Sequence, residues 1–544
     1  MADTVRVLMI NPRFQDSSFW NYVAACELAG AKAPSPPLGL LTVAAMLPAH
    51  WELRLVDRNV RELTDRDLVW ADVVFVGAML PQQFDALHII KTCASRGIPT
   101  VVGGPDPTSA RELYASANML VLGEVEGIID DFVAAFEAGQ RTGIFEAEKF
   151  TADITKTPKP RYDLINPRDY LDINVQFSRG CPFLCEFCDI IELYGRVPRT
   201  KNTQQVLDEL QAIYEMGHRG VVQFVDDNLI GNKKAVKAFL PHLIAWQKEH
   251  GYPFVFATEA SLNLADDDKF LGMLRDACFV GVFIGIESPD PDVLIAARKK
   301  QNIGRDIPAE IHKIQSYGIF VLAGFIIGMD NEKPGCGEAI ADLIEDCAIP
   351  VAIVSLLFAL PGTQLTRRLE REGRLSTGYA IVADVSSGDQ CTEGLNFTTL
   401  RPEVEILRDY RQLISRIFDK EAFFARVTAS VAHINGSGVN GKMHKSRFWK
   451  EVRDAVRMMW IVATRYPQIR GDVFRLLGHT ARSNPDALRH AFFQAGLYVH
   501  VGPYSQHVLS VLDRRIANAE RTTEPNVKRL ADATAQGEQV HSVL

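Results

Sequence analysis

Three cysteines on one short segment are the residues of this 544-residue chain best suited to chemistry. Cys181, Cys185 and Cys188 have the spacing CxxxCxxC and come directly after a strand-like run, residues 172–177. Three thiolates on one loop can hold three irons of a four-iron four-sulfur cluster, because sulfur ligands suit iron-sulfur chemistry. The fourth iron is then open to a substrate. A zinc knuckle or three buried thiols is the alternative, but no second paired motif follows to complete a zinc site.

The aromatic residue before the last cysteine, Phe187, adds to this pattern. Together the four residues resemble the cysteine motif of the radical S-adenosylmethionine (SAM) superfamily. The resemblance implies that the open iron binds the amino and carboxylate groups of SAM, and that reductive cleavage of SAM gives a 5′-deoxyadenosyl radical.

Composition indicates a globular protein of several domains. The chain is 47% hydrophobic and 23% charged, and its length predicts two to four domains. Its start lacks the features of a signal peptide, and no apolar run reaches the ~18 residues of a membrane-spanning helix. The remaining cysteines are scattered, which favours a reducing, cytoplasmic compartment over a disulfide framework and leaves their individual roles open. They are Cys26, Cys93, Cys278, Cys336, Cys347 and Cys391.

The net charge of −8 is unevenly distributed along the chain. Residues 401–544 contain 17 arginines and five lysines against 14 acidic residues, so this part carries a formal charge of +8. The remainder is strongly acidic. The C-terminal quarter is therefore expected to face a different partner or surface.

The first 140 residues read as alternating strands and helices. Continuous apolar strands separated by helices predict a parallel, doubly wound α/β domain over residues 1–140, with its ligand at the carboxyl ends of the strands. The expected strands are 5–10, 51–56, 73–77, 100–104 and 119–123, and the expected helices are 37–47 and 83–95.

Glycines end the later strands of this domain: Gly77, Gly103, Gly104 and Gly123. A glycine lets a bulky ligand approach the backbone, and the segments around these glycines resemble the cobalamin-binding domain of cobalamin-dependent radical SAM enzymes. The resemblance implies that these glycines contact cobalamin. The signature that supplies a histidine to cobalt is absent after the first strand, and His50 is not expected to reach the metal.

A proline-containing linker is expected at residues 141–170 and a second α/β unit at 171–375. Six strand candidates, each followed by a helix, predict a partial (β/α)₆ barrel with its site at the carboxyl ends of the strands. The candidates are 172–177, 220–225, 254–258, 280–287, 320–328 and 352–357, with helices such as 203–216 and 234–248 between them.

Polar residues and glycines at these strand ends are the candidate SAM contacts. The resemblance implies that Asp226 and Asp227 receive the methionyl amino group, although the usual glycine-glycine-glutamate motif is replaced here. It also implies that Glu287 binds a ribose hydroxyl. The other candidates are Glu259, the glycines Gly324 and Gly328 that bound the adenine-facing strand, and Arg196 and Arg199 for the methionyl carboxylate, unless these two are simply solvated loop arginines.

Residues 376–520 are expected to form a helical domain, followed by a polar tail, 521–544, predicted to be disordered. Apolar residues from Phe448 to Ala463 line one side of one helix and basic residues line the other. We expect a helical bundle docked on the barrel. The alternative is a basic amphipathic surface that rests on an anionic membrane and feeds a lipid into the barrel mouth. No module that reads nucleic acid is found.

The order of these segments resembles the cobalamin-binding radical SAM family (class B methyltransferases), and within it the hopanoid C-2 methylases. Residues 36–41, 56–60, 226–234 and 360–365 carry the closer resemblance. It implies a methyltransferase that acts on an unactivated carbon of a hydrophobic substrate, such as a hopanoid lipid, through the adenosyl radical and methylcobalamin. It also implies a low-potential electron donor, such as flavodoxin or ferredoxin. A cyclase or rearranging enzyme without methyl transfer and a non-catalytic cobalamin or redox sensor remain alternatives.

Overall fold

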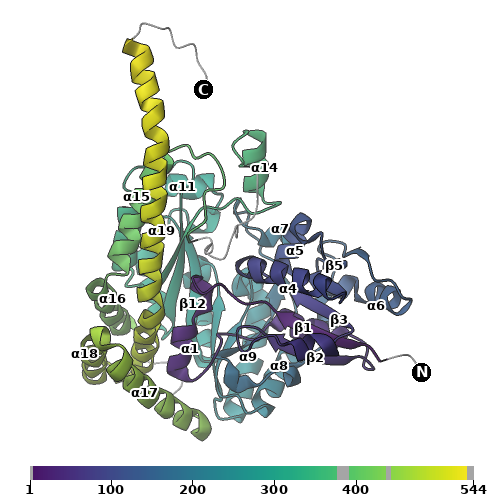
Figure 1. Cartoon of the computed structure of the whole chain (residues 1–544). Coiled ribbons are helices and arrows are strands. Elements are labelled where there is room, and N and C mark those ends of the chain that lie inside the picture. Colours follow the sequence, from purple (N-terminus) through teal and green to yellow (C-terminus); the bar gives the residue numbers. More distant parts are fainter. Residues whose placement is uncertain (1–3, 377–390, 436–442, 536–544) are drawn as a thin grey trace.

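The computed structural model describes residues 4–376, 391–435 and 443–535. Its N-terminal part is built on a six-stranded, fully parallel sheet (Figure 1). The strand order is β2-β1-β3-β4-β5-β6, so the direction of winding reverses at β1. The strands are β1 (Arg6–Asn11), β2 (Glu52–Asp57), β3 (Val73–Gly77), β4 (Thr100–Gly103), β5 (Met119–Leu122) and β6 (Gly143–Glu146).

Both faces of this sheet are covered. In β1, Val7 and Met9 belong to one hydrophobic cluster and Leu8 and Ile10 to another. The first cluster includes α2 (Leu38–Met46) and α6 (Ile129–Glu137), and the second includes α4 (Gln83–Ser95). Alternate side chains of a strand point to opposite faces, so the uninterrupted apolar strand is explained by burial on both sides.

The sixth strand, β6, was missed and lies beyond the predicted domain boundary at residue 140. It pairs only with β5, and its residues alternate between half-buried and exposed. An edge strand of this kind has no continuous apolar run, which is the pattern that revealed the other five strands. The sheet therefore extends into the segment predicted as a linker.

A second parallel sheet forms the middle of the molecule, with strand order β14-β13-β12-β11-β10-β7. The order follows the chain, as expected for a partial (β/α)₆ barrel, and helices such as α8 (Thr203–Glu215), α9 (Lys233–Glu249) and α12 (Ile307–Ser316) connect the strands. The strands are β7 (Asp172–Val175), β10 (Gly220–Phe224), β11 (Phe254–Glu259), β12 (Phe279–Glu287), β13 (Phe320–Ile327) and β14 (Ala352–Leu356).

A two-stranded antiparallel ribbon, β8 (Ser178–Arg179) and β9 (Arg199–Thr200), follows β7 and frames the cysteine segment. Close contacts join the two sheets near this point. Tyr170 donates a hydrogen bond to Asp57 at the end of β2 (3.0 Å), and the Ser35 hydroxyl donates to Asp172 at the start of β7. The start of β7, which leads into the cysteine segment, is therefore held against the N-terminal part of the molecule.

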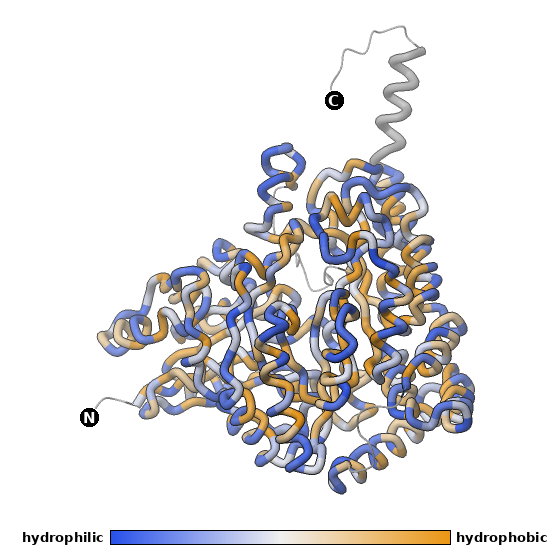
Figure 2. Tube along the Cα trace, turned by 180° about the vertical axis from the view of Figure 1, so that it is seen from behind, coloured by the Kyte–Doolittle hydropathy of each residue, from blue (hydrophilic) through white to orange (hydrophobic). Residues whose placement is uncertain are grey.

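The C-terminal part is helical, as predicted. Its long last helix, α19, lies beside α15 and α16 and reaches α1 (Val23–Ala29) near the other end of the chain (Figure 1). Hydrophobic residues gather between the elements, and the outer loops are mostly hydrophilic (Figure 2). The helices are α14 (Gln364–Arg371), α15 (Glu403–Ile417), α16 (Lys420–His433), α17 (Lys445–Arg465), α18 (Pro467–Ser483) and α19 (Leu488–Ala535).

Helix α19 continues to Ala535 and so extends into residues 521–544, the segment predicted to be a polar tail. Residues 536–544 lie outside the described part of the chain. Within that part, no helix is both long enough and apolar enough to cross a membrane.

Helix α17 docks at the amino ends of the second sheet. The Arg447 guanidinium donates to the carbonyls of Tyr252 and Phe254 (3.0 and 3.1 Å), just before and at the start of β11. The barrel mouth is formed by the opposite, carboxyl ends of the strands. The predicted docking of the helices on the barrel is therefore seen, whereas α17 is not placed to feed a lipid into the mouth.

Candidate active site

The cysteine segment is tightly held by backbone hydrogen bonds. The Cys181 amide donates to the Gly195 carbonyl (3.2 Å), and the Cys188 amide donates to the Cys185 carbonyl (3.2 Å). Gly180 has φ +93°, and a Cβ there would lie 2.9 Å from the Gly195 carbonyl oxygen. Only glycine fits this approach, so Gly180 lets the loop turn back on the β8–β9 ribbon.

The three thiols share one partly buried environment. Burial raises the pKa of all three thiols. The charge of Asp189, and then those of the other two thiols, raise the pKa of Cys188 further. Such thiols need a cation or metal to ionise. Two amides face them: Asn228 Nδ2 lies 3.8 Å from Cys181 Sγ, and Gln301 Nε2 lies 3.6 Å from Cys185 Sγ. Sulfur ligands with amide donors beside them fit an iron-sulfur cluster.

A single metal ion needs its ligands to converge on one point. In residues 4–376, 391–435 and 443–535, no three His, Cys, Asp or Glu side chains converge in this way. All nine cysteines are free thiols. The assignment of Cys181, Cys185 and Cys188 to a cluster stays a prediction that their shared loop and the neighbouring amides support.

Asp226 and Asp227 follow β10 and hold the start of the cysteine segment. Asp226 accepts hydrogen bonds from the Phe177 amide (3.1 Å) and from both the amide and the hydroxyl of Ser178, while Asp227 accepts from the Gly180 amide (2.8 Å). Burial raises their pKa values to about 7 and about 6. The structure thus gives both carboxylates a positioning role, and their contact with the methionyl amino group stays a prediction.

Glu259 is at the carboxyl end of β11 and is accessible to solvent. Surrounding protein nevertheless raises its pKa to about 7, with Asp227 and Asp226 adding to the shift. Glu259, Asp226 and Asp227 thus lie at the carboxyl ends of the neighbouring parallel strands β10 and β11. The contact of Glu259 with SAM stays a prediction.

Glu287 ends β12 and forms an ion pair with Lys299 (2.6 Å). Lys299 is buried; burial alone would lower its pKa, but Glu287 and the thiols of Cys185 and Cys188 outweigh that effect and the net shift is upward. Gly285 leaves room for the pair, because a Cβ there would lie 2.4 Å from Glu287 Oε1. The predicted ribose contact of Glu287 is untested, and its partnership with Lys299 was not foreseen.

The glycines of β13 are required by packing inside the protein. A Cβ on Gly324 would lie 2.9 Å from the Phe283 ring, and one on Gly328 would lie 2.5 Å from Leu395. Gly328 also has φ +96°, and its amide donates to both carboxylate oxygens of Glu332 (3.0 and 2.8 Å). These contacts explain the two glycines without a ligand, and the adenine contact stays a prediction.

The two candidate arginines differ. Arg196 is exposed. Arg199 is largely buried: it forms an ion pair with Glu124 (2.8 Å) and donates to the carbonyls of Ala152 and Tyr194 (2.9 Å each). Arg199 is thus not a solvated loop residue, because Glu124 and two carbonyls hold its guanidinium. The contact of either arginine with the methionyl carboxylate stays a prediction.

Sequence reasoning missed the network to which Arg199 belongs. Arg179 on β8 forms ion pairs with Glu124 (3.2 Å) and Glu126 (2.7 Å), which follow β5 of the first sheet. Burial would raise the pKa of Glu126, but the charge and hydrogen bond of Arg179 outweigh it and the net shift is downward. Four buried charges thus join the first sheet to the cysteine ribbon. The one signal in the sequence that could have indicated this network is the presence of two acidic residues, Glu124 and Glu126, just after a predicted strand.

The glycines of the first sheet lie at its carboxyl edge, as predicted. A Cβ on Gly103 would lie 2.7 Å from the Val121 carbonyl oxygen, and one on Gly104 would lie 2.7 Å from the Ala78 carbonyl oxygen. Gly77 has Leu40 3.0 Å from its Cβ position, whereas Gly123 has φ +81° and no closer contact than 3.3 Å. Packing explains the first three, and their contact with cobalamin stays a prediction.

This glycine edge faces the cysteine segment. Glu124, which directly follows Gly123, forms ion pairs with Arg179 (3.2 Å) and Arg199 (2.8 Å) of the ribbon that frames this segment. His50 lies at the opposite, amino edge, 3.2 Å from Glu137, which agrees with the expectation that it does not reach cobalt.

Two family models match the chain: the radical SAM superfamily over residues 175–344, and a domain of unknown function, DUF4070, over residues 363–513. An uncharacterized methyltransferase of Synechocystis sp. is 44% identical over 78% of this chain and 78% of its own length. The hopanoid C-2 methylase of Rhodopseudomonas palustris is 38% identical over 79% of this chain and 80% of its own length. The chain belongs to the cobalamin-binding radical SAM family. The protein is thus a radical SAM C-methyltransferase.

Solved structures of similar fold contain the expected cofactors: TsrM from Kitasatospora setae was solved with cobalamin and a [4Fe-4S] cluster bound (TM-score 0.56, 17% identity). The cobalamin-dependent SAM radical enzyme OxsB, solved with aqua-cobalamin and SAM bound, has a TM-score of 0.57 to this chain at 15% identity. The similarity covers 99% of this chain and 82% of OxsB, and it shows a common fold. The DUF4070 match begins at Thr363, after β14, and covers α14 to most of α19.

Proposed function

We propose that this radical SAM methyltransferase methylates an unactivated carbon of a hydrophobic substrate, and that the substrate is a hopanoid lipid. The observation that carries the proposal is the meeting of the two sheets: Glu124 and Glu126, at the glycine edge of the first, form ion pairs with the ribbon that frames the cysteine segment. The 38% identity to a hopanoid C-2 methylase supports the substrate class.

The residues of this chain have distinct roles in the proposal. Cys181, Cys185 and Cys188 would hold the cluster, with Asn228 and Gln301 donating to two of the sulfur atoms. The carboxyl ends of β10 to β13 would hold SAM, and the glycine edge would hold cobalamin. When bound, these groups supply one-electron reduction of SAM and a methyl carrier. The protein contributes position and exclusion of water.

We further propose that a low-potential donor such as flavodoxin or ferredoxin reduces the enzyme, and that it works in the reducing cytoplasm. The nine free cysteines support this compartment. A peripheral contact with the inner membrane would be made by the basic C-terminal helices.

The test is an anaerobic assay of the full-length enzyme with restored cluster and cobalamin. Methyl-labelled SAM, a low-potential reductant and a hopanoid-containing lipid extract are added, and mass spectrometry counts the products. Near-equal amounts of S-adenosylhomocysteine, 5′-deoxyadenosine and labelled lipid are expected. Deoxyadenosine without homocysteine product or label would instead identify a cyclase or rearranging enzyme, and intact SAM would identify a non-catalytic sensor.

A further inference from the structure

Helix α17 turns an apolar side to the solvent. Two of its tryptophans, Trp449 and Trp460, are 67% and 62% exposed. After the adjacent pair Phe448 and Trp449, successive residues of this side are three or four positions apart, so they form one stripe about 18 Å long. The exposed apolar residues are Phe448, Trp449, Val452, Val456 and Trp460, defined here as the α17 stripe.

The inward side of α17 is occupied by packing within the protein: Met458, Ile461 and Val462 are buried in the hydrophobic core. Arg447 is fully buried, forms an ion pair with Glu451 (2.9 Å) and donates to two carbonyls at the start of β11. Lys450 pairs with Asp454 (2.8 Å) on the same flank. A helix that meets water on its outer side normally keeps that side polar. The α17 stripe is a second apolar side, beyond the one that packs on the core, and this indicates that it meets an apolar environment.

Positive charge surrounds the stripe. Helices α17 and α18, residues 445–483, contain nine Lys and Arg residues against three acidic ones, a formal charge of +6. Arg453, next to Val452, is 70% exposed. Tryptophan and arginine side by side are typical of helices that lie in the headgroup region of a membrane. A second copy of the chain would bring two surfaces of like charge together, whereas an anionic bilayer is complementary.

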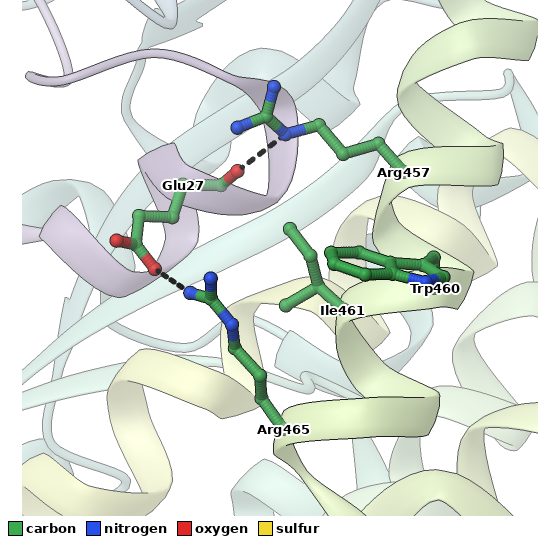
Figure 3. A pocket seen from close by; sticks show the side chains of 5 residues that line it. All are labelled: Glu27, Arg457, Trp460, Ile461 and Arg465. Atoms are coloured by element: carbon green, nitrogen blue, oxygen red, sulfur yellow. Dashed lines mark hydrogen bonds and ion pairs between the residues drawn. The ribbon is translucent and has the colours of Figure 1, made fainter.

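A cavity of about 360 Å³ lies at the Trp460 end of the stripe, between α17 and α1 (Figure 3). Arg457 donates to the Glu27 carbonyl (3.1 Å) and Arg465 pairs with the Glu27 carboxylate (3.3 Å), so both guanidinium groups are held in place. The negative charge of Glu27 offsets one of the two positive charges. The site beside the stripe therefore keeps one net positive charge, which can bind a lipid phosphate.

We propose that the α17 stripe docks on the surface of an anionic phospholipid bilayer, with α17 lying in the headgroup region. Arg453, Arg457 and Arg465 then face phosphate groups, and the two tryptophans enter the acyl boundary. This docking does not depend on which substrate is methylated. Because α17 packs at the amino ends of the second sheet, docking leaves the carboxyl ends and the cysteine segment directed away from the lipid.

The test uses the full-length holoenzyme and sedimented vesicles of phosphatidylcholine with or without phosphatidylglycerol. The wild type is expected to bind the anionic vesicles, and its tryptophan emission is expected to shift to shorter wavelength. The double variant Trp449→Ser, Trp460→Ser is expected to bind at least about tenfold more weakly, because two large apolar contacts are lost. Val69→Ser is the matched control, since Val69 is 79% exposed on the first domain.

Equal binding of the double variant and the wild type, or no binding of the wild type to anionic vesicles, would overturn the proposal. Analytical ultracentrifugation tests the alternative that a second copy of the chain covers the stripe. Self-association of the wild type that is lost in the double variant would assign the stripe to such a dimer contact. Unchanged thermal unfolding of the double variant, expected because both tryptophans are exposed, shows that the fold is intact.

Discussion

Two side-chain amides, Asn228 and Gln301, lie against the sulfur atoms of Cys181 and Cys185. Hydrogen bonds to cluster sulfurs stabilise the more negative, reduced state and so set the reduction potential. Asn228 is itself fixed by Ser261, whose amide donates to its Oδ1 (3.3 Å). The amides therefore give this chain a means of tuning a cluster that the three cysteines alone do not provide.

Replacement of any one of Cys181, Cys185 and Cys188 by Ala is expected to abolish cluster-dependent cleavage of SAM, because two thiolates cannot hold the cluster. Cobalamin binding should be nearly unchanged, since the glycine edge belongs to the other sheet. Mass spectrometry of 5′-deoxyadenosine and the visible absorbance of bound cobalamin measure the two effects. Cys93→Ala, in the core of the first domain, is the control. Cleavage of SAM that persists in all three variants would contradict the assignment of these cysteines to a cluster.

Gly285→Ala is expected to lower the free energy of unfolding by about 1–3 kcal/mol, because the new Cβ would lie 2.4 Å from Glu287 Oε1 and 2.9 Å from Lys299 Nζ. The ion pair must move, and Lys299 lies close to the thiols. Urea denaturation measures the change. Gly272→Ala is the matched control: nothing lies within 4 Å of its Cβ position in α10 (Asp268–Asp276), so stabilisation of about 0.5–1 kcal/mol is expected. Equal effects of the two substitutions would contradict this account.

At the scale of elements, the ribbon β8–β9 links the cysteine segment to the first sheet through Arg179, Arg199, Glu124 and Glu126. A short ribbon has few hydrogen bonds of its own, so its position depends on these charges. Methyl transfer, as proposed above, needs a fixed distance between the cofactors held by the two sheets. We expect this ion-pair network to fix that distance.

Glu124→Gln tests the network. It leaves the Arg199 guanidinium without a charged partner, while Arg179 keeps Glu126. Removing one partner of a buried pair costs about 3–5 kcal/mol. We expect methyl transfer to fall more than SAM cleavage, so the ratio of labelled product to 5′-deoxyadenosine decreases. Glu62→Gln is the control, because Glu62 is exposed and its ion pair with Arg13 is worth at most about 1 kcal/mol. An unchanged ratio would mean that the network has no part in positioning.

The main elements could be predicted from sequence where apolar patterns are continuous. Strand Val73–Gly77 and helix Gln83–Ser95 were predicted with the bounds that the structure has. The ribbon was not, because two-residue strands leave no periodic pattern. The partners of Arg199 and Glu287 were also missed, since they are brought together by folding from positions as far apart as residues 124 and 199.

At the scale of the whole molecule, buried carboxyl groups link stability to pH. Burial raises the pKa of Asp172 to about 7, although the Ser35 hydroxyl donates to it across the boundary of the two sheets. Between about pH 4 and pH 7 the folded protein holds a proton that the unfolded chain has released. The contribution of Asp172 to the free energy of unfolding therefore falls as pH rises through this range.

Asp172→Asn removes this titration. The free energy of unfolding should fall less between about pH 4 and pH 8 in the variant than in the wild type, by on the order of 2–4 kcal/mol. Urea denaturation across that range measures it. Asp131→Asn, on the exposed side of α6, is the control. Parallel pH profiles for Asp172→Asn and the wild type would show that Asp172 is ionised throughout.

The contact between the first and last helices has a consequence for how the protein is made. His500 of α19 contacts the Phe19 carbonyl (2.8 Å) and stacks on Tyr22, and α17 covers α1. Ribosomes add about 5–20 residues per second, so residues 19–29 emerge long before the helices that cover them. The first sheet can form early during synthesis, but residues 19–29 cannot be covered until almost the entire chain has been made. We therefore expect the packing of α17 and α19 on this segment to be a late, post-translational step.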